Sequence, residues 1–407
     1  MFTRFPPPHT DAPEAAMTTT APRIPREKEN DHTAAVGERR REFLHEQTGV
    51  DLEHVGRFSF DPGVLQGNVE NYVGVAQVPI GVAGPLRING EHAQGDFYVP
   101  LATTEGTLVA SYNRGMRLLS ECGGVKTTVV DDQMQRAPAF IFDDALQARE
   151  FGEWMDAHFD DIRAAAEATT RSGKLTYIGH YQVGPLRYLR VNYTTGDAAG
   201  QNMTGKATLA ACEWIKENYP GGAEYVLSGA IDTDKKHSQI NMLLTRGKRV
   251  VAEAVIKNDV LQRLMGVETK TLFDYRQIGM AGGFLAGSSY NGAHAANGLT
   301  GIFIATGQDA ANISESHSGI TYARLLENGD YYWSVTLTSL IVATYGGGTG
   351  LPTQRECLEL LGCYGKGKVR KLAEICAATV LAGDTSLTSA ILAGHWVTSH
   401  DRLGRNR

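Results

Sequence analysis

The spacing of hydrophobic and polar positions along the chain predicts alternating helices and strands. Apolar residues recur with helical spacing over 33–49, 103–122, 143–169 and 202–218, and again over 353–362 and 367–398. We expect Thr103 or Thr104 to cap the second of these helices. Small residues such as Gly115 would let that helix pack closely against a neighbour.

Shorter apolar runs bounded by turn residues predict strands. They occur within 64–100, at 123–130 and 136–142, and over 174–196, where a Gly-Pro turn divides the run. From the strand at 136–142 to the helix at 202–218 the order is therefore strand, helix, strand, strand, helix, which favours a small α+β unit. The whole chain is predicted to be α+β.

Composition adds limits on the class of protein. The chain has 407 residues, of which 42% are hydrophobic and 21% charged, as expected for a globular protein of two or three folded units. The net charge of -6 gives no general reason to bind nucleic acid or an anionic membrane. Because no run of about 18 consecutive apolar residues occurs, we expect no transmembrane helix.

The two ends of the chain and its cysteines allow further predictions, about disorder and about the cellular compartment. Residues 1–32 hold six of the fourteen prolines and lack the apolar run of a secretory signal, so they are predicted to be a disordered tail. Residues 401–407 are expected to be a flexible basic tail. Five cysteines without a C-x-x-C pair indicate free thiols in a reducing cytoplasm, where packing is a commoner role than catalysis.

One stretch has the spacing of a phosphate-binding loop. Gly200 to Lys206 fits G-x-x-x-x-G-K, but Ala207 stands where that loop needs a hydroxyl group for magnesium. A second near-match at 362–369 ends in Val369 and fails in the same way. Both are attributed to chance in a glycine-rich chain. No G-x-G-x-x-G occurs either, so a Rossmann fold has no local support.

The same stretch still leads from a glycine-containing turn into a helix. The backbone N–H groups at a helix N-terminus can hold a phosphate or pyrophosphate. Alternatively, Asp197 simply caps the helix. The residues alone leave these two interpretations equally open.

Three further motifs have a structural and a chemical interpretation. Asp234, Lys235 and Lys236 form either a solvated turn or an ammonium group poised to polarise a carbonyl, and the first is commoner. Asp309 follows an apolar run and can cap a helix. The glycines of 346–350 form a flexible turn or allow backbone to approach a ring or phosphate. His395 and His400 are five apart, a poor spacing for a metal pair, and no metal site is expected.

Taken together, the motifs resemble those of the 3-hydroxy-3-methylglutaryl-CoA (HMG-CoA) reductase family over roughly residues 60–400. They appear in the family's order: ENYVG (70–74), PIGVAGPL (79–86), PLATTEGTLVAS (100–111), GDAAGQNM (196–203), DTDKK (232–236), AHAAN (293–297), GQDAA (307–311), YGGGTGL (345–351) and AGHWVTSH (393–400). The ATTEG sequence is similar to the biosynthetic, class I-like branch, and we expect no membrane anchor of the kind that animal members have.

The resemblance implies a four-electron reduction of HMG-CoA to mevalonate and CoA, with two NADPH consumed. It assigns Lys235 the stabilisation of the oxyanion that hydride attack creates. Glu105 would donate a proton to the developing alcohol, and burial can keep such an acid protonated near neutral pH. Asp309 would link these groups by hydrogen bonds. His400 would protonate the departing CoA thiolate.

Binding residues are implied by the same resemblance. For the hydroxymethylglutaryl group they are Arg136, Ser228, Asp234, Lys236 and Asn297, and for CoA they are Ser111 and His294. For the dinucleotide they are Asp197, Gly200, Gln201, Asn202 and Met203, with Thr170 and Arg171 toward the 2′-phosphate of NADP.

The family's fold implies a domain arrangement. A small helical segment would cover 33–75. A large substrate and CoA domain, built around a long central helix, would comprise 76–136 and 227–400. A small ferredoxin-like domain for the dinucleotide, not a Rossmann fold, would be inserted at 137–226. The resemblance also implies a cytoplasmic homodimer or dimer of dimers with active sites at a subunit interface.

Some positions depart from the family pattern. Ala230 replaces an asparagine, Ala199 and Gln201 replace methionines, Gly292 interrupts a Tyr-Asn-Ala-His run, and residues 315–319 replace a Ser-Ser-Asn-Cys pattern. Two alternatives therefore stay open: an acyl-CoA thioester reductase with altered acyl preference, and a non-catalytic relative that binds CoA or NADP.

Overall fold

A computed structural model describes residues 22–394. The chain divides into two compact units, one up to Gln77 and one from Val78 onward. His400, the predicted tail at 401–407 and residues 1–21 of the predicted N-terminal tail lie outside the described residues.

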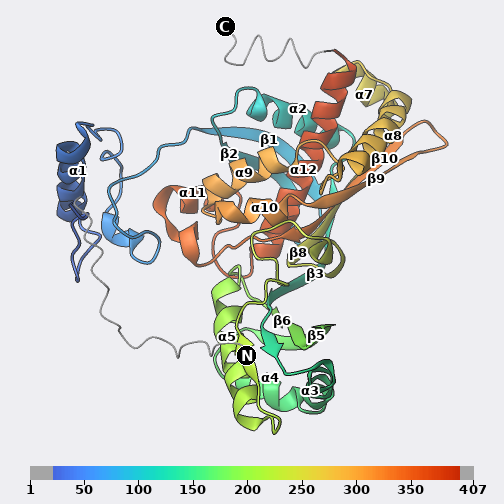
Figure 1. Cartoon of the computed structure of the whole chain (residues 1–407). Coiled ribbons are helices and arrows are strands. Elements are labelled where there is room, and N and C mark those ends of the chain that lie inside the picture. Colours follow the sequence, from blue (N-terminus) through green and yellow to red (C-terminus); the bar gives the residue numbers. More distant parts are fainter. Residues whose placement is uncertain (1–21, 395–407) are drawn as a thin grey trace. The chain divides into compact units, whose positions relative to one another are not determined.

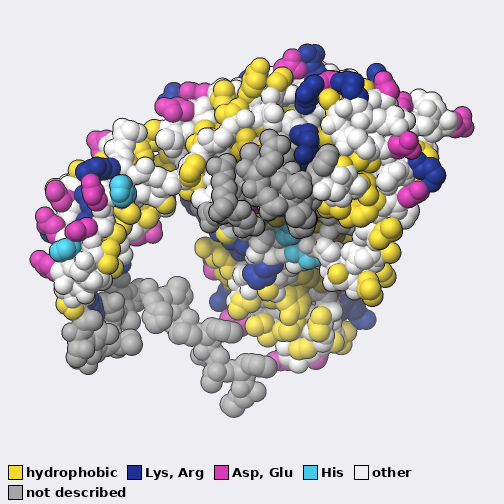
Figure 2. All heavy atoms as spheres, turned by 90° about the horizontal axis from the view of Figure 1, so that it is seen from above, with side chains coloured by type: hydrophobic (Ala, Val, Ile, Leu, Met, Phe, Trp, Pro, Cys, Tyr) yellow, Lys and Arg dark blue, Asp and Glu magenta, His cyan; other side chains and the backbone are white. Residues whose placement is uncertain are grey.

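The N-terminal unit contains helix α1 (Ala34–Thr48) and a short 3-10 turn, η1 (Pro62–Leu65). The Thr33 side chain accepts the N–H of Val36 and thereby caps α1. Acidic and basic side chains are mixed over the surface of this helix (Figure 2).

A buried arginine orders the segment that precedes α1. Arg40 is fully buried, donates to the carbonyl oxygens of Pro25 and Asp31, and also pairs with the Asp31 carboxylate. Part of the predicted tail, residues 22–32, is thus in contact with α1. A buried guanidinium needs several acceptors, and this segment supplies them.

Within residues 22–394, the second unit holds the remaining helices and all the strands (Figure 1). Its helices are α2 (Leu108–Glu121), α3 (Ala145–Ala157), α4 (Phe159–Glu167), α5 (Gln201–Asn218), α6 (Gln239–Leu244), α7 (Asn258–Met265), α8 (Thr269–Ala286), α9 (Ala295–Thr306), α10 (Ile313–Ser316), α11 (Pro352–Leu360) and α12 (Val369–Leu392), with 3-10 turns η2 (Ala310–Asn312) and η3 (Gly347–Gly350). Its strands are β1 (Ile80–Asn89), β2 (Gln94–Ala102), β3 (Lys126–Arg136), β4 (Ala139–Ile141), β5 (Lys174–Val183), β6 (Leu186–Thr194), β7 (Glu224–Val226), β8 (Gly247–Ile256), β9 (Gly319–Leu325) and β10 (Tyr331–Leu340).

The strands form two antiparallel sheets. β1 and β2 make a hairpin, and the larger sheet has the order β7-β4-β6-β3-β8-β10-β9, with β5 added beside β6. β3 is the strand that connects the two halves of the large sheet. Its residues 126–133 pair with β8, and its residues 134–136 pair with β6. The predicted mixture of helices and strands is confirmed, and both sheets are antiparallel.

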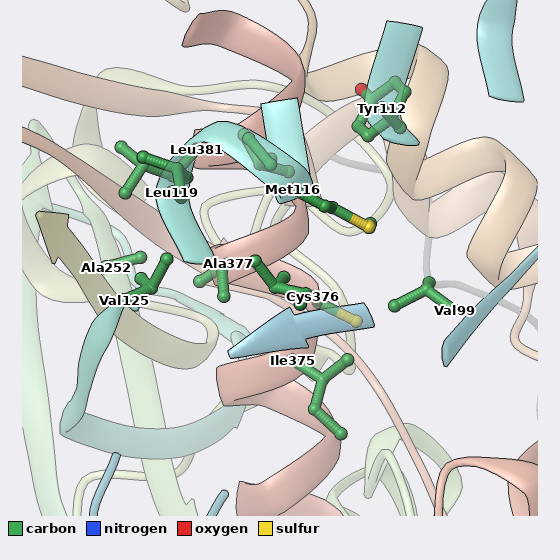
Figure 3. Packing of buried hydrophobic residues seen from close by; sticks show 14 of the residues in the cluster. Val99, Tyr112, Met116, Leu119, Val125, Ala252, Ile375, Cys376, Ala377 and Leu381 are labelled. Atoms are coloured by element: carbon green, nitrogen blue, oxygen red, sulfur yellow. The ribbon is translucent and has the colours of Figure 1, made fainter. Parts of the chain in front are cut away.

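Helix α12 lies at the centre of the larger hydrophobic core. Side chains from α2, β2 and β8 surround its residues Ile375, Cys376 and Ala377 (Figure 3). Two glycines let α2 and α12 approach closely. A Cβ on Gly115 would collide with the carbonyl of Ala382, and one on Gly383 with the ring of Tyr112.

α12 is long and apolar enough to cross a membrane, but 78% of its most hydrophobic window is buried inside the protein. The apolar side chains of α12 are thus mostly packed inside the hydrophobic core. Four of the five cysteines are also buried, and all five are free thiols. Burial raises the pKa of the Cys363 thiol to about 12, which fits a packing role.

A second, smaller core is built from aromatic and aliphatic residues of β4, β5, β6, α3, α4 and α5. Phe140 and Phe151 pack with ring centroids 4.7 Å apart, and Trp154 lies beside Phe151. The single helix predicted for 143–169 is divided at His158 into α3 and α4, with Asp144 capping the first. The buried residues of this core lie between Phe140 and Ile215.

The helix predicted at 103–122 begins later than expected. α2 starts at Leu108, after a left-handed Thr107, and no side chain caps it. Thr103 instead accepts the N–H of Glu105 at 2.9 Å. The hydroxyl thus fixes a turn around Glu105, which leaves that side chain outside the helix.

Candidate active site

The turn containing Asp234, Lys235 and Lys236, which we call the lysine turn (residues 230–236), has an unusual backbone. Ala230, Thr233 and Lys235 all adopt left-handed conformations, with φ of 66°, 53° and 56°. Each costs a non-glycine residue about 1–2 kcal/mol. The surrounding structure must therefore hold this turn.

Polar side chains supply that support, and Arg190 and Asn241 among them are buried. These side chains are Arg190, which donates to the Ile231 carbonyl at 2.9 Å, Arg136, which pairs with Asp232 at 3.1 Å, and Asn241, which donates to Thr233 Oγ1 at 2.7 Å. Since a different partner binds each of three successive residues, the turn is fixed along its length.

The Lys235 side chain reaches a carboxylate from another part of the chain. Its Nζ lies 2.7 Å from Asp309 Oδ2, and both side chains are a little over two-fifths exposed. Asp309 Oδ1 accepts the N–H of Ala311 and caps η2. Asp309 is thus both the helix cap of the simpler interpretation and the partner of the lysine, with one oxygen for each task.

The backbone of Lys235 is held separately by Glu315, which Arg246 binds in turn. The sequence singled out neither residue as part of the site. Glu315 Oε1 accepts the Lys235 N–H at 3.0 Å and pairs with Arg246 at 2.6 Å. Arg246 also binds Asp234 at 2.9 Å. Burial raises the pKa of Glu315 to about 7 despite the adjacent guanidinium.

The glycine turn before α5 lies against the lysine turn. Gly200 is left-handed, with φ of 88°, and Gln201 begins the helix. Gln201 Nε2 donates to Asp234 Oδ1 at 3.0 Å and to Asn312 Oδ1 at 3.1 Å. The first bond within α5 runs from Thr204 N–H to Gly200 O, so the N–H groups of 201–203 precede the helical ladder. These donors are suited to an anion.

From the sequence, Asp197 was considered as a cap of the helix that follows it, α5, but its carboxylate binds another helix. Its carboxylate accepts the N–H groups of Gly367, Lys368 and Val369, at the N-terminus of α12. Asp197 therefore caps the long core helix and not α5. This contact fixes the turn that precedes Gly200.

The remaining predicted dinucleotide residues lie around this turn. A Cβ on Gly173 would meet the sulfur of Met203 at 2.5 Å and Thr170 Cγ2 at 3.2 Å, so the 170–173 and 200–203 segments are in contact. Arg171 and Asn202, which belong to these two segments, are both exposed. The fold thus brings together two segments that the resemblance assigned to one ligand.

Glu105 lies in a second group, at a cleft of about 430 Å³. Glu105 and Asn297 line this cleft together with Val78, Ala102, Thr103, Thr104, Ala296, Thr300, Gly301 and Ile304. Asn297 Nδ2 donates to Glu105 Oε2 at 2.8 Å. Glu105 is exposed among the described residues, so the burial expected for it is not present here.

The two groups lie near opposite ends of α9. Asn297 is the third residue of this twelve-residue helix, and Asp309 follows its last residue by three. Such a helix is about 18 Å long. The Lys235–Asp309 pair thus lies near the C-terminal end of α9. Glu105 of the same chain contacts Asn297 near the N-terminal end.

The residues expected to contact CoA lie beside the cleft residues. His294 is buried, stacks on Tyr112 with centroids 4.8 Å apart, and burial lowers its pKa to about 4. Its imidazole is therefore neutral at physiological pH. Ser111 Oγ lies 3.2 Å from Ser386 Oγ, which places it against α12.

Asp384 of α12 anchors the entry to α9. Its Oδ1 accepts the N–H groups of Ala293 and His294, and Oδ2 accepts the Tyr290 hydroxyl at 2.5 Å. A Cβ on Gly292 would collide with this carboxylate, which explains the glycine that interrupts the family motif. Burial raises the pKa of Asp384 to about 6.

This pKa predicts a pH dependence of stability. Between about pH 4 and pH 6 the folded protein keeps the Asp384 proton that the unfolded chain has lost, so its ionisation lowers stability as pH rises, by on the order of 3 kcal/mol. Asp384→Asn should therefore gain stability relative to the wild type across this window. Denaturant unfolding at each pH measures it, with Asp274→Asn, an exposed site on α8, as the control. A pH-independent difference between Asp384→Asn and the wild type would contradict the assignment.

Three other predicted substrate residues are accounted for individually. Arg136 is engaged by Asp232, and Lys236 Nζ donates to the Asp234 carbonyl at 3.0 Å. Ser228 is exposed in the loop after β7. Of the glycines at 346–350, Gly348 is closely packed, since a Cβ on it would lie 2.7 Å from the carbonyl oxygen of Gly307. Gly346 and Gly347 have left-handed backbones, with φ of 81° and 58°.

One group of metal-type ligands occurs within the described residues, away from the lysine turn. Glu91, His92 and Glu374 have ligand atoms within 4.8 Å of one another. Glu374 accepts the N–H groups of Glu91, His92 and Ala93, so backbone donors already surround it. Its role is to hold the β1–β2 hairpin.

Comparison with known proteins identifies the family. The family model for hydroxymethylglutaryl-coenzyme A reductase matches residues 37–405. The chain is 44% identical to the 3-hydroxy-3-methylglutaryl-coenzyme A reductase of Pyrococcus horikoshii over 374 residues, covering 90% of this chain and 91% of the relative. It is 45% identical to that of Aeropyrum pernix over 391 residues, covering 94% and 92%.

A solved structure resembles the fold. It is the class II 3-hydroxy-3-methylglutaryl-CoA reductase from Streptococcus pneumoniae bound to NADPH in open conformations, with a TM-score of 0.67 at 20% identity over 87% of this chain and 86% of that one. The two relatives are archaeal and this neighbour is a class II enzyme, so the class I-like assignment is not supported. The matches at 44–45% identity span nearly the whole chain. The chain belongs to the hydroxymethylglutaryl-coenzyme A reductase family.

Proposed function

We propose that this protein reduces HMG-CoA to mevalonate and CoA with two molecules of NADPH, in the biosynthetic direction. The observation that carries the proposal is the contact of Lys235 Nζ with Asp309 Oδ2 at 2.7 Å, beside the turn that begins α5. Reduction of a carbonyl group creates a negatively charged oxygen, and a cation held at this point can stabilise that oxyanion.

Each proposed catalytic residue answers one demand of the reaction. Lys235 stabilises the oxyanion formed when hydride reaches the thioester or aldehyde carbon, and Asp309 orients the ammonium group. Glu105, whose carboxylate is held by Asn297, donates the proton to the new alcohol. His400 protonates the CoA thiolate; this role rests on the resemblance alone, since residue 400 is not among the described ones.

The proposed NADPH site is the turn 197–203 with Thr170 and Arg171. The N–H groups at the start of α5 suit a pyrophosphate, and exposed Arg171 suits a 2′-phosphate. Bound there, NADPH supplies hydride. Gln201, which donates to Asp234, orients the glycine turn toward the lysine turn.

We further infer that residues 137–226, with their own aromatic core, form the small cofactor domain, and that 76–136 and 227–400 form the large one. The separate core and the α12-centred core support this division. A ferredoxin-like arrangement fits the order of strands and helices in the small core. The free thiols fit a cytoplasmic location.

A homodimer is part of the proposal. Glu105 and the Lys235–Asp309 pair lie near opposite ends of α9, a helix about 18 Å long. One carbonyl cannot meet both groups within a single chain of this conformation. We infer that Glu105 of one subunit completes the site around Lys235 of another, as a dimer or a dimer of dimers.

The assay that tests the proposal follows the absorbance of reduced nicotinamide with HMG-CoA and, separately, with other acyl-CoA thioesters. NADPH oxidation that depends on HMG-CoA is the expected result. Retained CoA binding without oxidation would favour a non-catalytic relative. A comparison of NADPH with NADH tests the assigned cofactor.

A reductase with altered acyl preference is the second candidate, because of Ala230. This residue is left-handed and exposed, and it lacks the side-chain amide expected beside the substrate. Loss of one substrate hydrogen bond weakens binding by about 0.5–1.5 kcal/mol. Oxidation of NADPH only with another thioester would favour this candidate.

Replacing Asp197 should affect both the cofactor site and stability. Asp197→Ala removes the acceptor of three α12 N–H groups, which should lower stability by about 1 kcal/mol and loosen the glycine turn. The KM for NADPH should rise. Lys206→Ala, an exposed change on α5, should alter neither quantity. An increase in KM with Lys206→Ala and none with Asp197→Ala would restore the phosphate-loop interpretation.

A further inference from the structure

Glu315 is a buried carboxylate that contacts the main chain of Lys235. It is 1% exposed and lies on α10, six residues after Asp309. One oxygen accepts the Lys235 N–H at 3.0 Å and the Arg246 guanidinium at 2.6 Å. The short segment 309–315 thus holds Lys235 twice, by its ammonium group and by its backbone.

Arg246 extends this support to the neighbouring residue. Its side chain is 1% exposed and bridges Glu315 on one side and Asp234 on the other, at 2.6 and 2.9 Å. The planar guanidinium can hold two carboxylates in fixed directions, which a lysine cannot do. Asp234 in turn accepts a bond from Gln201, so the network reaches the turn at the start of α5.

The backbone conformation of the lysine turn needs support, which this network of hydrogen bonds provides. Lys235 is left-handed, with φ of 56°, and its side chain emerges in a direction that an ordinary turn would not give. A bond to its N–H fixes this conformation directly. We propose that Glu315, locked by Arg246, is a positioning residue that aims the Lys235 ammonium group at the reacting oxygen.

This inference rests on the proposed function, because it assigns Glu315 a role through Lys235. Charge is not what the role requires. An acceptor oxygen at this point is needed, and burial of the pair keeps water from competing for the Lys235 N–H. Glutamine at 315 can supply the oxygen and alanine cannot.

The test compares Glu315→Ala, Glu315→Gln and Arg246→Lys by steady-state kinetics with HMG-CoA and NADPH. Glu315→Ala should lower kcat about 100-fold, because misplacing a catalytic group by about 1 Å has an effect of that size. The KM for each substrate should stay near the wild-type value. Glu315→Gln should recover kcat to within about 5-fold of the wild type, since a neutral acceptor replaces a charged one.

A matched control is Glu374→Ala, which removes another buried glutamate that accepts backbone N–H groups, in the β1–β2 hairpin. It should lower stability without lowering kcat per folded molecule. A kcat for Glu315→Ala within 2-fold of the wild type would overturn the positioning role. If Glu315→Ala does not fold, an unchanged kcat for Arg246→Lys overturns it. An inactive wild type would reject the proposed function and this inference together.

Discussion

Replacing Lys235 with alanine should lower kcat by about 10²- to 10³-fold while the protein stays folded, as expected for loss of an oxyanion-stabilising donor. Lys235 is a little over two-fifths exposed, and its ion pair with Asp309 is correspondingly open to solvent. Such a pair contributes little to stability, typically about 0–1 kcal/mol. The variant should therefore separate catalysis from folding.

The measurement is kcat and KM with HMG-CoA and NADPH, together with a thermal unfolding curve. Lys206→Ala is the matched control, because it removes an exposed lysine from α5. It should leave kcat and the melting temperature near their wild-type values. Retention of wild-type turnover by Lys235→Ala would remove the role assigned to this residue.

Mixing two inactive variants should restore activity. Glu105→Gln keeps the shape of the side chain and its contact with Asn297 but cannot donate the required proton, so it should lose about 10²- to 10⁴-fold in kcat. Lys235→Ala should be inactive for a different reason. If each site takes Glu105 from one subunit and Lys235 from its partner, a mixed dimer has one site with both residues intact.

Equal amounts of the two variants, unfolded and refolded together, should recover about a quarter of wild-type activity, because half of the randomly formed dimers are mixed and each has one intact site of two. Separately refolded samples that are mixed afterwards provide the control. No recovery from co-refolded subunits that do form dimers would mean that one chain supplies both residues. The arrangement at the two ends of α9 would then have to change during catalysis.

Helices and strands could be predicted from the sequence more accurately than the contacts between distant residues. The apolar periodicity located α5 and the start of α12 within two residues of their observed positions, and the Gly-Pro pair located the turn between β5 and β6. These features depend on local spacing. The start of α2 was missed by five residues, since Thr103 bonds to the Glu105 N–H and holds a turn that resembles a helix cap in sequence.

The long-range contacts at the site could not be read from spacing. Asp197 caps a helix that begins some 170 residues later, and Glu315 holds a residue 80 positions before it. No local pattern distinguishes these carboxylates from exposed ones. The pairing of Lys235 with Asp309 was expected only because two motifs belonged to one family, and the left-handed backbone that aims the lysine had no sequence signal.

Gln201 illustrates why a departure from a family pattern can carry information. In sequence it is only a polar residue where the family has methionine. In the structure it bonds to Asp234 and Asn312, and thereby joins the glycine turn to the lysine turn. Gln201 is partly buried, and a polar side chain that loses contact with water needs other partners. One of its two acceptors, Asp234, belongs to the proposed site.

The most direct test of the proposed reaction is its stoichiometry. Purified protein, limiting HMG-CoA and excess NADPH are allowed to react to completion, and oxidised NADPH, free CoA thiol and product are measured in the same sample. A four-electron reduction requires two NADPH oxidised for each thiol released, with mevalonate as the product. One NADPH per thiol with an aldehyde as the end product, or thiol release without oxidation, would contradict the account.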